Sequence, residues 1–315
     1  MKLIIQIPCY NEAATLTTSL DALPKSIPGI DQLEILIIDD GCTDDTVQVA
    51  RDWGVDHVVS HVGNKGLAVA FMTGLTNALA LGADIIVNTD ADNQYNADDI
   101  PQLIEPILKH QAEFVIGARP ISDTEHFSPI KKRLQRLGSA VVRWVSGTDV
   151  LDAPSGFRAL SREAAIQLNV FSAYTYTLET IIQAGVKNIP LVSVPVRTNA
   201  DLRPSRLVKS IRDYVKRSIL TIGRVFVIYR PFQVLGIVGV ALTAGGLILG
   251  IRYLYFVLIG EGAGHIQSVI LTAILLLMGY HTFSLAILAD LISINRRLLE
   301  QSQVHLREMR LSRKP

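Results

Sequence analysis

The chain of 315 residues has few cysteines, few aromatic residues and almost no net charge. Its two cysteines, Cys9 and Cys42, are too few for a disulfide framework and fit a reducing compartment. Aromatic residues make up 6% of the chain, and the formal net charge is +1. The start of the sequence, MKLIIQIPCYNE, has one lysine and no small-residue cleavage site, so we expect a first strand there and not a signal peptide.

Two long runs without a formally charged residue lie in the C-terminal third, at 234–251 and 266–289. A bilayer core of about 30 Å requires about 20 apolar residues when the chain is helical. We therefore expect two transmembrane helices, at about 234–259 and 266–290, within the region 231–294. These runs exclude a purely cytosolic enzyme, a disordered chain and a secreted disulfide scaffold.

Charge is distributed unevenly along the chain. Residues 1–205 carry 16 Lys and Arg against 24 Asp and Glu, residues 206–230 carry seven against one, and residues 295–315 carry six against two. Basic clusters beside membrane helices attract acidic headgroups and lie on the cytoplasmic side. We therefore expect a multi-pass protein of the cell membrane with its N-terminal domain, both termini and a basic tail (295–315) in the cytoplasm. Because the N-terminal domain is acidic, we expect no nucleic-acid partner.

The first 204 residues alternate short apolar runs with helical patterns, which is typical of an α/β domain with a mainly parallel sheet. The expected strands are Lys2–Ile7, Glu34–Ile38, His57–Ser60, Asp84–Asn88, Phe114–Ile116 and Leu191–Val196. The expected helices are Thr15–Leu23, Asp45–Asp52, Gly66–Leu81 and Asp98–His110. No G-x-G-x-x-G motif follows an expected strand, so hydride transfer with a dinucleotide has little support.

Residues 205–230 differ from the domain that precedes them. Their apolar residues fall on one helical face and their basic residues mostly on the others. This pattern predicts an amphipathic helix that lies in the membrane interface. A surface helix packed on the N-terminal domain is the alternative.

The most informative motif follows the expected strand at 84–88. Asp90 and Asp92 stand one residue apart, and Gln94 follows them. Two carboxylates on a loop that leaves a strand can face one cleft, and Mg²⁺ or Mn²⁺ binds such carboxylates together with phosphate oxygens of a substrate. A solvated acidic turn is the alternative for this motif taken alone.

The motif belongs to an ordered set of four: PCYNE at 8–12, DDGCTDD at 39–45, NKG at 64–66 and DADNQ at 90–94. With this set the chain resembles a family 2 inverting glycosyltransferase with the GT-A fold. The resemblance implies a metal site of Asp90, Asp92 and Gln94 that holds Mg²⁺ or Mn²⁺. It also implies a nucleotide-sugar site that consists of Pro8, Tyr10, Glu12, Asp39, Asp40, Lys65 and Asp90.

Later motifs narrow the resemblance to the polyprenyl-phosphate group of that family, which includes dolichol-phosphate mannose synthases and undecaprenyl-phosphate sugar transferases. They are GAR at 117–119, the basic run at 131–136 and DAPSGFR at 152–158. The resemblance implies that Asp92 and Arg119 are catalytic. The residues it implies for the lipid phosphate are Arg119, Lys132, Arg136, Arg197 and Arg206. One departure is that Tyr95 and Asn96 follow Gln94, where members often have Asp or His and then Pro.

The expected activity is the transfer of a sugar from a UDP- or GDP-linked donor to undecaprenyl or dolichyl phosphate, with inversion, by direct attack of the lipid phosphate. A lipid phosphate is mostly dianionic at neutral pH, so it needs positioning and not deprotonation. The alternatives are a processive polysaccharide synthase of the same superfamily and a catalytically inactive membrane scaffold.

Gly246 and Gly250 form a small-xxx-small pattern, from which we expect a homo-oligomer.

Overall fold

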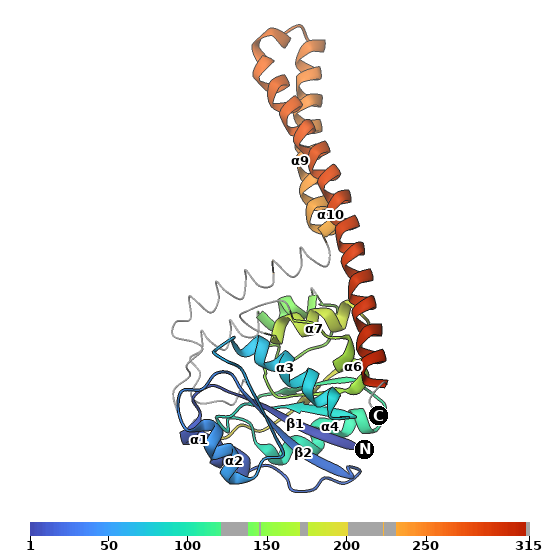
Figure 1. Ribbon diagram of the computed structural model, residues 1–315. Coiled ribbons are helices and arrows are strands. Elements are labelled where there is room, and N and C mark those ends of the chain that lie inside the picture. Colours follow the sequence, from blue (N-terminus) through green and yellow to red (C-terminus); the bar gives the residue numbers. More distant parts are fainter. Residues whose placement is uncertain (121–137, 145, 171–175, 201–222, 224–230, 313–315) are drawn as a thin grey trace. The chain divides into compact units, whose positions relative to one another are not determined.

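The computed structural model describes residues 1–120, 138–144, 146–170, 176–200, 223 and 231–312. The chain divides into two compact units. The first is Met1–Ile222 together with Val304–Pro315, and the second is Gly223–Gln303. The first unit contains the sheet, and the second contains most of two long apolar helices (Figure 1).

The seven described strands form one sheet in the order β3-β2-β1-β4-β6-β5-β7. The strands are β1 (Lys2–Cys9), β2 (Gln32–Asp39), β3 (His57–Ser60), β4 (Ile85–Asn88), β5 (Phe114–Ala118), β6 (Arg158–Ser161) and β7 (Leu191–Pro195). Neighbours pair in parallel except on both sides of β6, which is antiparallel to β4 and β5. The mainly parallel sheet that the sequence predicts is confirmed, but β6 was not predicted.

Helices cover both faces of this sheet (Figure 1). The helices of the first unit are α1 (Ala13–Asp21), α2 (Thr46–Trp53), α3 (Leu67–Ala80), η1 (Ala97–Asp99), α4 (Ile100–Leu108), α6 (Arg162–Gln167) and α7 (Thr177–Val186). One core lies between the sheet and α3, α6 and α7, and the other lies between the sheet and α1, α2 and α4. Alternation along β1 supplies both cores, because Ile4 belongs to the first and Leu3 and Ile5 belong to the second.

Gly185 of α7 packs against the backbone of Ser146. A Cβ atom at this glycine would lie 1.9 Å from the carbonyl oxygen of Ser146, so a larger residue cannot occupy the position without a shift of the backbone. The absent side chain at Gly185 therefore lets α7 approach the helical residues that precede β6.

The second unit contains α9 (Pro231–Leu258), η2 (Gly262–His265) and the greater part of α10 (Ile266–Ser312). Within the described residues, α9 and α10 are long and apolar enough to cross a membrane. The most apolar 18-residue segment has a mean hydropathy of 2.3 in α9 and 1.9 in α10. Only 11% of each segment is buried, whereas the core helix of a soluble domain is mostly buried. They form the candidate membrane hairpin.

Glycines bring the two helices of the hairpin close together. A Cβ atom at Gly246 would lie 3.0 Å from the side chain of Leu276, and one at Gly250 would lie 3.2 Å from that of Thr272. Gly246 and Gly250, the two glycines from which we expected a homo-oligomer, thus face α10 of the same chain. Self-association therefore stays a prediction, and these two glycines no longer support it.

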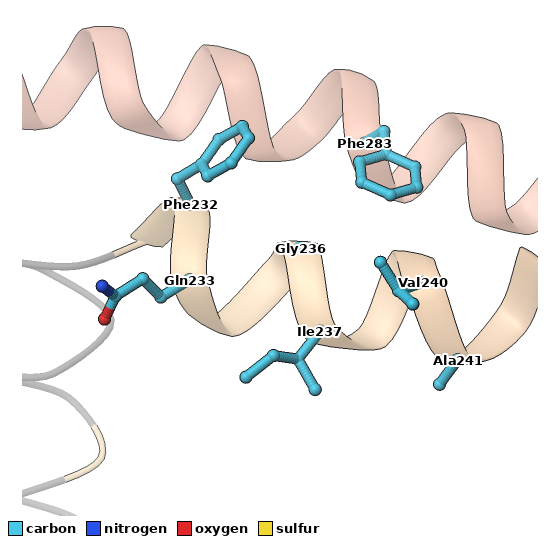
Figure 2. Close-up of a pocket in the computed structure, with 7 residues that line it drawn as sticks. All are labelled: Phe232, Gln233, Gly236, Ile237, Val240, Ala241 and Phe283. Carbon is cyan, nitrogen blue, oxygen red and sulfur yellow. The ribbon is translucent and has the colours of Figure 1, made fainter.

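An apolar groove of about 540 Å³ runs along the first turns of α9. Its lining residues are Phe232, Gln233, Gly236, Ile237, Val240, Ala241 and Phe283. Figure 2 shows Phe232 and Phe283 in the space between the two helices and Ile237 pointing away from α10. The groove is a surface of the kind that lipid chains cover in a bilayer.

The end of α10 belongs to the first unit and packs on α6. The guanidinium of Arg307 donates hydrogen bonds to the carbonyl oxygens of Ile166 (3.0 Å) and Leu168 (3.1 Å) and to Oδ1 of Asn169 (2.5 Å). The last carbonyls of a helix have no partner within it, so a cation at this end is favourable. The predicted basic tail thus continues α10 as far as residue 312, and at Arg307 it binds protein.

We expect Gly185→Ala to destabilise the first unit by about 3 kcal/mol, or about 6 to 12 °C in Tm, because the new methyl group meets the backbone of Ser146. Thermal unfolding of the full chain in detergent measures the change. Gly138→Ala is the control, since a Cβ atom there would have no neighbour within 4 Å among the residues that the structure describes. Equal Tm values for the two variants would contradict the interpretation.

Candidate active site

The carboxyl ends of β1, β2, β4 and β5 lie at one edge of the sheet. The register pairs Cys9 with Asp39 in β1 and β2, and Gln6 with Asn88 in β1 and β4. Ligands of open α/β sheets bind outside the carboxyl ends of parallel strands. The predicted site residues in or after these strand ends are Pro8, Tyr10, Glu12, Asp39, Asp40, Asp90, Asp92, Gln94 and Arg119.

Asp40 holds the loop that precedes α3. Its Oδ1 accepts hydrogen bonds from the backbone amide of Lys65 (2.9 Å) and from Nδ1 of His61 (2.8 Å), and its Oδ2 accepts one from the amide of Gly66 (2.9 Å). The Nε2 atom of His61 bonds in turn to Thr73 of α3 at 3.0 Å. Asp40 is buried, whereas the side chain of Lys65 is exposed. Of these two predicted nucleotide-sugar residues, Asp40 shapes the loop and Lys65 extends from it.

Asp39, Glu12 and Tyr10 are three further predicted residues at the ends of β1 and β2, and they differ in exposure. Burial opposes the charge of Asp39 most strongly, but several hydrogen bonds together, among them a 2.7 Å bond from the backbone amide of Cys42, outweigh it and lower the pKa of Asp39. Glu12 is buried, and its Oε2 accepts a hydrogen bond from Thr15 at 3.1 Å. Tyr10 is 44% exposed. Of the three, Tyr10 is the side chain presented to solvent.

The loop after β4, which we call the acidic loop (residues 90–96), contains both carboxylates of the predicted metal site. Asp90 is half-buried, and this burial, followed by the charge of Asp92, raises the pKa of Asp90 to about 7. The nearby cations Arg119 and Arg158 oppose the shift. Oδ1 of Asp92 accepts a hydrogen bond from the backbone amide of Gln94 at 3.2 Å. Two carboxylates are therefore held close enough to disfavour each other's charge.

Arg119, at the end of β5, forms a two-pronged ion pair with Asp152. Its Nε and Nη2 atoms lie 2.7 and 3.1 Å from the two carboxylate oxygens, and the Asp152 side chain is fully buried. The ion pair joins the end of β5 to the segment that enters β6, which we call the Asp152 loop (residues 152–157). Arg119 was predicted to bind a lipid phosphate, and the structure adds a partner that orients its guanidinium.

Arg158 follows the Asp152 loop and is fully buried. Its guanidinium donates to the carbonyl oxygens of Ser155 (2.7 Å), Thr177 (3.1 Å) and Ala153 (3.0 Å), and to Oγ1 of Thr180 (2.6 Å). Burial lowers the pKa of Arg158 to about 10. The residue thus fixes the loop backbone and contributes positive charge near the acidic loop.

The segment after β7 binds the acidic loop and the helix that follows it. Arg197 donates its backbone amide and its Nε and Nη2 atoms to the carboxylate of Asp99, at 2.6 to 2.9 Å. The side chain of Asn199 donates to the carbonyl oxygens of Asn93 (3.0 Å) and Tyr95 (3.3 Å). Arg197 was predicted to bind the lipid phosphate, and its guanidinium here binds Asp99. Lys132, Arg136 and Arg206 lie outside the described residues, as does the predicted amphipathic helix at 205–230 apart from residue 223.

The sequence analysis missed the partners that position the predicted residues. It quoted Asp152 only as the start of a motif, and it assigned nothing to Asp99, Arg158 or Asn199. The departure of Tyr95 from the family pattern was the one available signal, because this residue of the acidic loop is buried against the Asp152 loop. The other partners have no local pattern, since each meets its target from a distant part of the chain.

The carboxylates of the acidic loop fit a divalent cation that is bound partly by the protein and partly by oxygen atoms of a substrate. Asp90 and Asp92 repel each other's charge, and a cation between them would relieve that repulsion. Among the residues that the structure describes, no group of three or more His, Cys, Asp or Glu side chains could hold a metal ion. Mg²⁺ is commonly bound by one or two carboxylates together with water and phosphate oxygens, so two carboxylates suffice.

Residues 4–168 match the sequence pattern of the protein family described as Glycosyl transferase family 2. The chain is 31% identical to the UDP-N-acetylglucosamine–dolichyl-phosphate N-acetylglucosaminyltransferase of Methanococcus voltae, over 61% of this chain and 83% of the relative. It is 27% identical to the dolichol-phosphate mannosyltransferase of Pyrococcus furiosus, over 78% of this chain and 72% of the relative.

A solved structure shares the fold. It is glucosyl-3-phosphoglycerate synthase from Mycobacterium tuberculosis in complex with Mn²⁺, uridine diphosphate and glucosyl-3-phosphoglycerate. The TM-score is 0.54 at 23% identity, over 70% of this chain and 79% of that one. Together with the family match, this likeness confirms the GT-A fold that the motifs predict.

We expect Asp152→Asn to lower the free energy of unfolding by about 3 kcal/mol, because it leaves Arg119 without its charged partner. Denaturant unfolding of the full chain in detergent measures the loss. The double variant Asp152→Asn/Arg119→Met should lose less than the sum of the two single variants. Strict additivity would show that the two side chains are not coupled.

Proposed function

This chain belongs to glycosyltransferase family 2, and we propose that it transfers a sugar from a nucleotide sugar to a polyprenyl phosphate at a membrane, with inversion at the anomeric carbon. The observation that carries the proposal is the activity named for the proteins that this chain resembles. Proteins named as dolichyl-phosphate, dolichol-phosphate and undecaprenyl-phosphate sugar transferases match it over 72 to 83% of their own lengths. The candidate membrane hairpin fits an acceptor whose tail lies in a bilayer.

The reaction needs a nucleophile, a leaving group and a means of controlling their charge. A phosphate monoester has a second pKa of about 6, so the lipid phosphate is mostly dianionic at neutral pH and requires no general base. Its oxygen attacks the anomeric carbon as the bond to the nucleotide diphosphate breaks, in one displacement without a covalent enzyme intermediate. The protein therefore acts by positioning and by electrostatic stabilisation.

The acidic loop is the proposed site for the leaving group. Asp90, Asp92 and Gln94 would hold Mg²⁺ or Mn²⁺, which when bound supplies positive charge to the diphosphate. Pro8, Tyr10, Glu12, Asp39 and Lys65 line the nucleotide-sugar site in the proposal, and Asp40 holds the loop that carries Lys65. The solved structure of the same fold contains Mn²⁺ with a nucleoside diphosphate, which supports this division of roles.

Arginines and lysines are the proposed site for the acceptor phosphate. They are Arg119, Lys132, Arg136, Arg197 and Arg206. For Arg119 and Arg197, Nε and Nη2 bind a carboxylate of the protein. A guanidinium carries five N–H donors in a rigid fork, so a carboxylate on one edge orients the remaining donors toward a ligand.

The topology of the proposal follows from charge. Basic residues flank the hairpin at 206–230 and 295–315, and the connection at 260–265 contains no lysine or arginine. The positive-inside rule then puts the catalytic domain and both termini in the cytoplasm of the cell, where nucleotide sugars are available.

The identity of donor and acceptor is tested by incubating the purified full chain with polyprenyl phosphate, Mg²⁺ or Mn²⁺ and a panel of labelled UDP- and GDP-sugars. We expect one label to pass into the organic phase on extraction. A chain that binds a nucleotide sugar without forming labelled lipid would contradict the proposal and favour an inactive scaffold.

Asp92→Asn should abolish transfer at any concentration of Mg²⁺ or Mn²⁺, because the amide lacks the charge that holds the cation. The initial rate of lipid labelling, titrated with each metal, measures the effect, and EDTA should silence the unaltered chain. Asp98→Asn is the control, since it removes an exposed carboxylate six residues further along. Full rescue of Asp92→Asn by excess metal would exclude Asp92 as a ligand.

The product should carry the anomeric configuration opposite to that of the donor. An α-linked nucleotide sugar should give a β-linked sugar phosphate lipid, because one displacement inverts the carbon that is attacked. Nuclear magnetic resonance of the extracted lipid distinguishes the two anomers. Retention would require a second displacement and would overturn the proposed mechanism.

A further inference from the structure

The hydroxyl group of Tyr95 joins two loops that the proposed function assigns to opposite substrates. Tyr95 belongs to the acidic loop, and its side chain is buried. Its oxygen accepts a hydrogen bond from the backbone amide of Gly156 at 2.9 Å, and the Oγ of Ser155 lies 3.5 Å away. Its ring stacks on Phe157 with 5.1 Å between the centroids. One side chain of the acidic loop thus contacts three consecutive residues of the Asp152 loop.

Gly156 is the point at which the Asp152 loop touches the acidic loop. A Cβ atom at this residue would lie 2.9 and 3.1 Å from the two carboxylate oxygens of Asp90. Its carbonyl oxygen accepts a hydrogen bond from Asn88 of β4 at 2.8 Å. The amide of Gly156 is bound by Tyr95, its carbonyl by Asn88, and its α-carbon lies against Asp90.

The Asp152 loop also determines the position of Arg119, through the ion pair with Asp152. The Arg119 guanidinium carbon lies 5.9 Å from the centroid of the Tyr95 ring. The ring of Tyr95 therefore contacts Arg119, the cation that the proposed function assigns to the acceptor. The hydroxyl oxygen of Tyr95 contacts the Asp152 loop, which orients Arg119.

We propose that Tyr95 is a positioning residue: its hydroxyl group fixes the separation between the acidic loop, which holds the leaving group, and Arg119, which holds the attacking lipid phosphate. This inference rests on the proposed function. An in-line displacement requires the attacking and departing oxygens on opposite sides of one carbon, so a small change in this separation lowers the rate of the chemical step. It leaves the binding of either substrate alone much less affected.

The backbone of the acidic loop does not depend on this hydroxyl group. Residues 93–96 are bound from the other side by the segment after β7, through a bridge between Tyr95 and Thr198 and through Asn199. Loss of the Tyr95 oxygen alone therefore leaves the loop anchored and its ring stacking on Phe157 intact. What is lost is the acceptor for the amide of Gly156.

Tyr95→Phe tests the proposal, because it removes one oxygen atom and keeps the ring. We expect kcat for transfer to the lipid phosphate to fall by about 10- to 100-fold, with the KM for the nucleotide sugar changed by no more than about twofold. Calorimetric binding of the nucleoside diphosphate with Mn²⁺ should likewise match that of the unaltered chain. A loss of this binding would overturn the proposal, since it would make Tyr95 part of the donor site.

Tyr176→Phe is the matched control. Its hydroxyl group is also buried and lies near Gly156, with 3.4 Å to the carbonyl oxygen, but Tyr176 does not belong to the acidic loop. If Tyr95 acts only through stability, both variants should lose Tm and keep their kcat when assayed well below Tm. We expect the fall in kcat for Tyr95→Phe alone, and an equal fall in both variants would overturn the inference.

Amide hydrogen exchange gives a readout that does not depend on turnover. In full-length Tyr95→Phe, peptides that cover residues 152–157 should exchange faster, while those that cover 90–94 should be unchanged. Unchanged exchange at 152–157 would overturn the coupling. If the unaltered chain labels no lipid, the proposed function fails, and hydrogen exchange still decides whether Tyr95 holds the Asp152 loop.

Discussion

The ion pair between Arg119 and the fully buried carboxylate of Asp152 is the contact on which the geometry of the candidate site depends. A carboxylate without access to water needs a cation close by, and Arg119 supplies it at the end of β5. The pairing places the Asp152 loop beside the sheet edge, which in turn brings Gly156 against Asp90. A charge-neutralisation requirement thus connects the end of β5 with the acidic loop.

Much of the fold could be predicted because burial leaves a pattern in the sequence. The strands at 2–9, 32–39 and 57–60 are apolar runs that end in polar residues, and the structure contains them. The strand β6 was missed because two of its four residues, Arg158 and Ser161, are polar although all four are buried. The guanidinium of Arg158 is satisfied by carbonyl oxygens from distant segments, and no local periodicity reveals such partners.

The sequence predicts which residues form the candidate site but does not predict the contacts that these residues make within the protein. It predicts a chemical role for Asp40, Arg119 and Arg197, and these roles stay predictions. The structure shows that each of these side chains binds the protein itself, through the loop at 61–66, Asp152 and Asp99 respectively. A sequence motif reports which groups are present, whereas their partners depend on a tertiary arrangement that motif spacing does not encode.

The antiparallel direction of β6 has a consequence for how such a protein can diversify. Because β5 and β6 run in opposite directions, the chain leaves the sheet after Ala118 and returns at Arg158 on the same edge. An excursion with both ends on one edge can gain or lose residues without changing the order or register of the parallel strands. Evolution, or an engineer, can therefore vary the residues between Arg119 and Asp152 while the strands β1 to β4 are inherited intact.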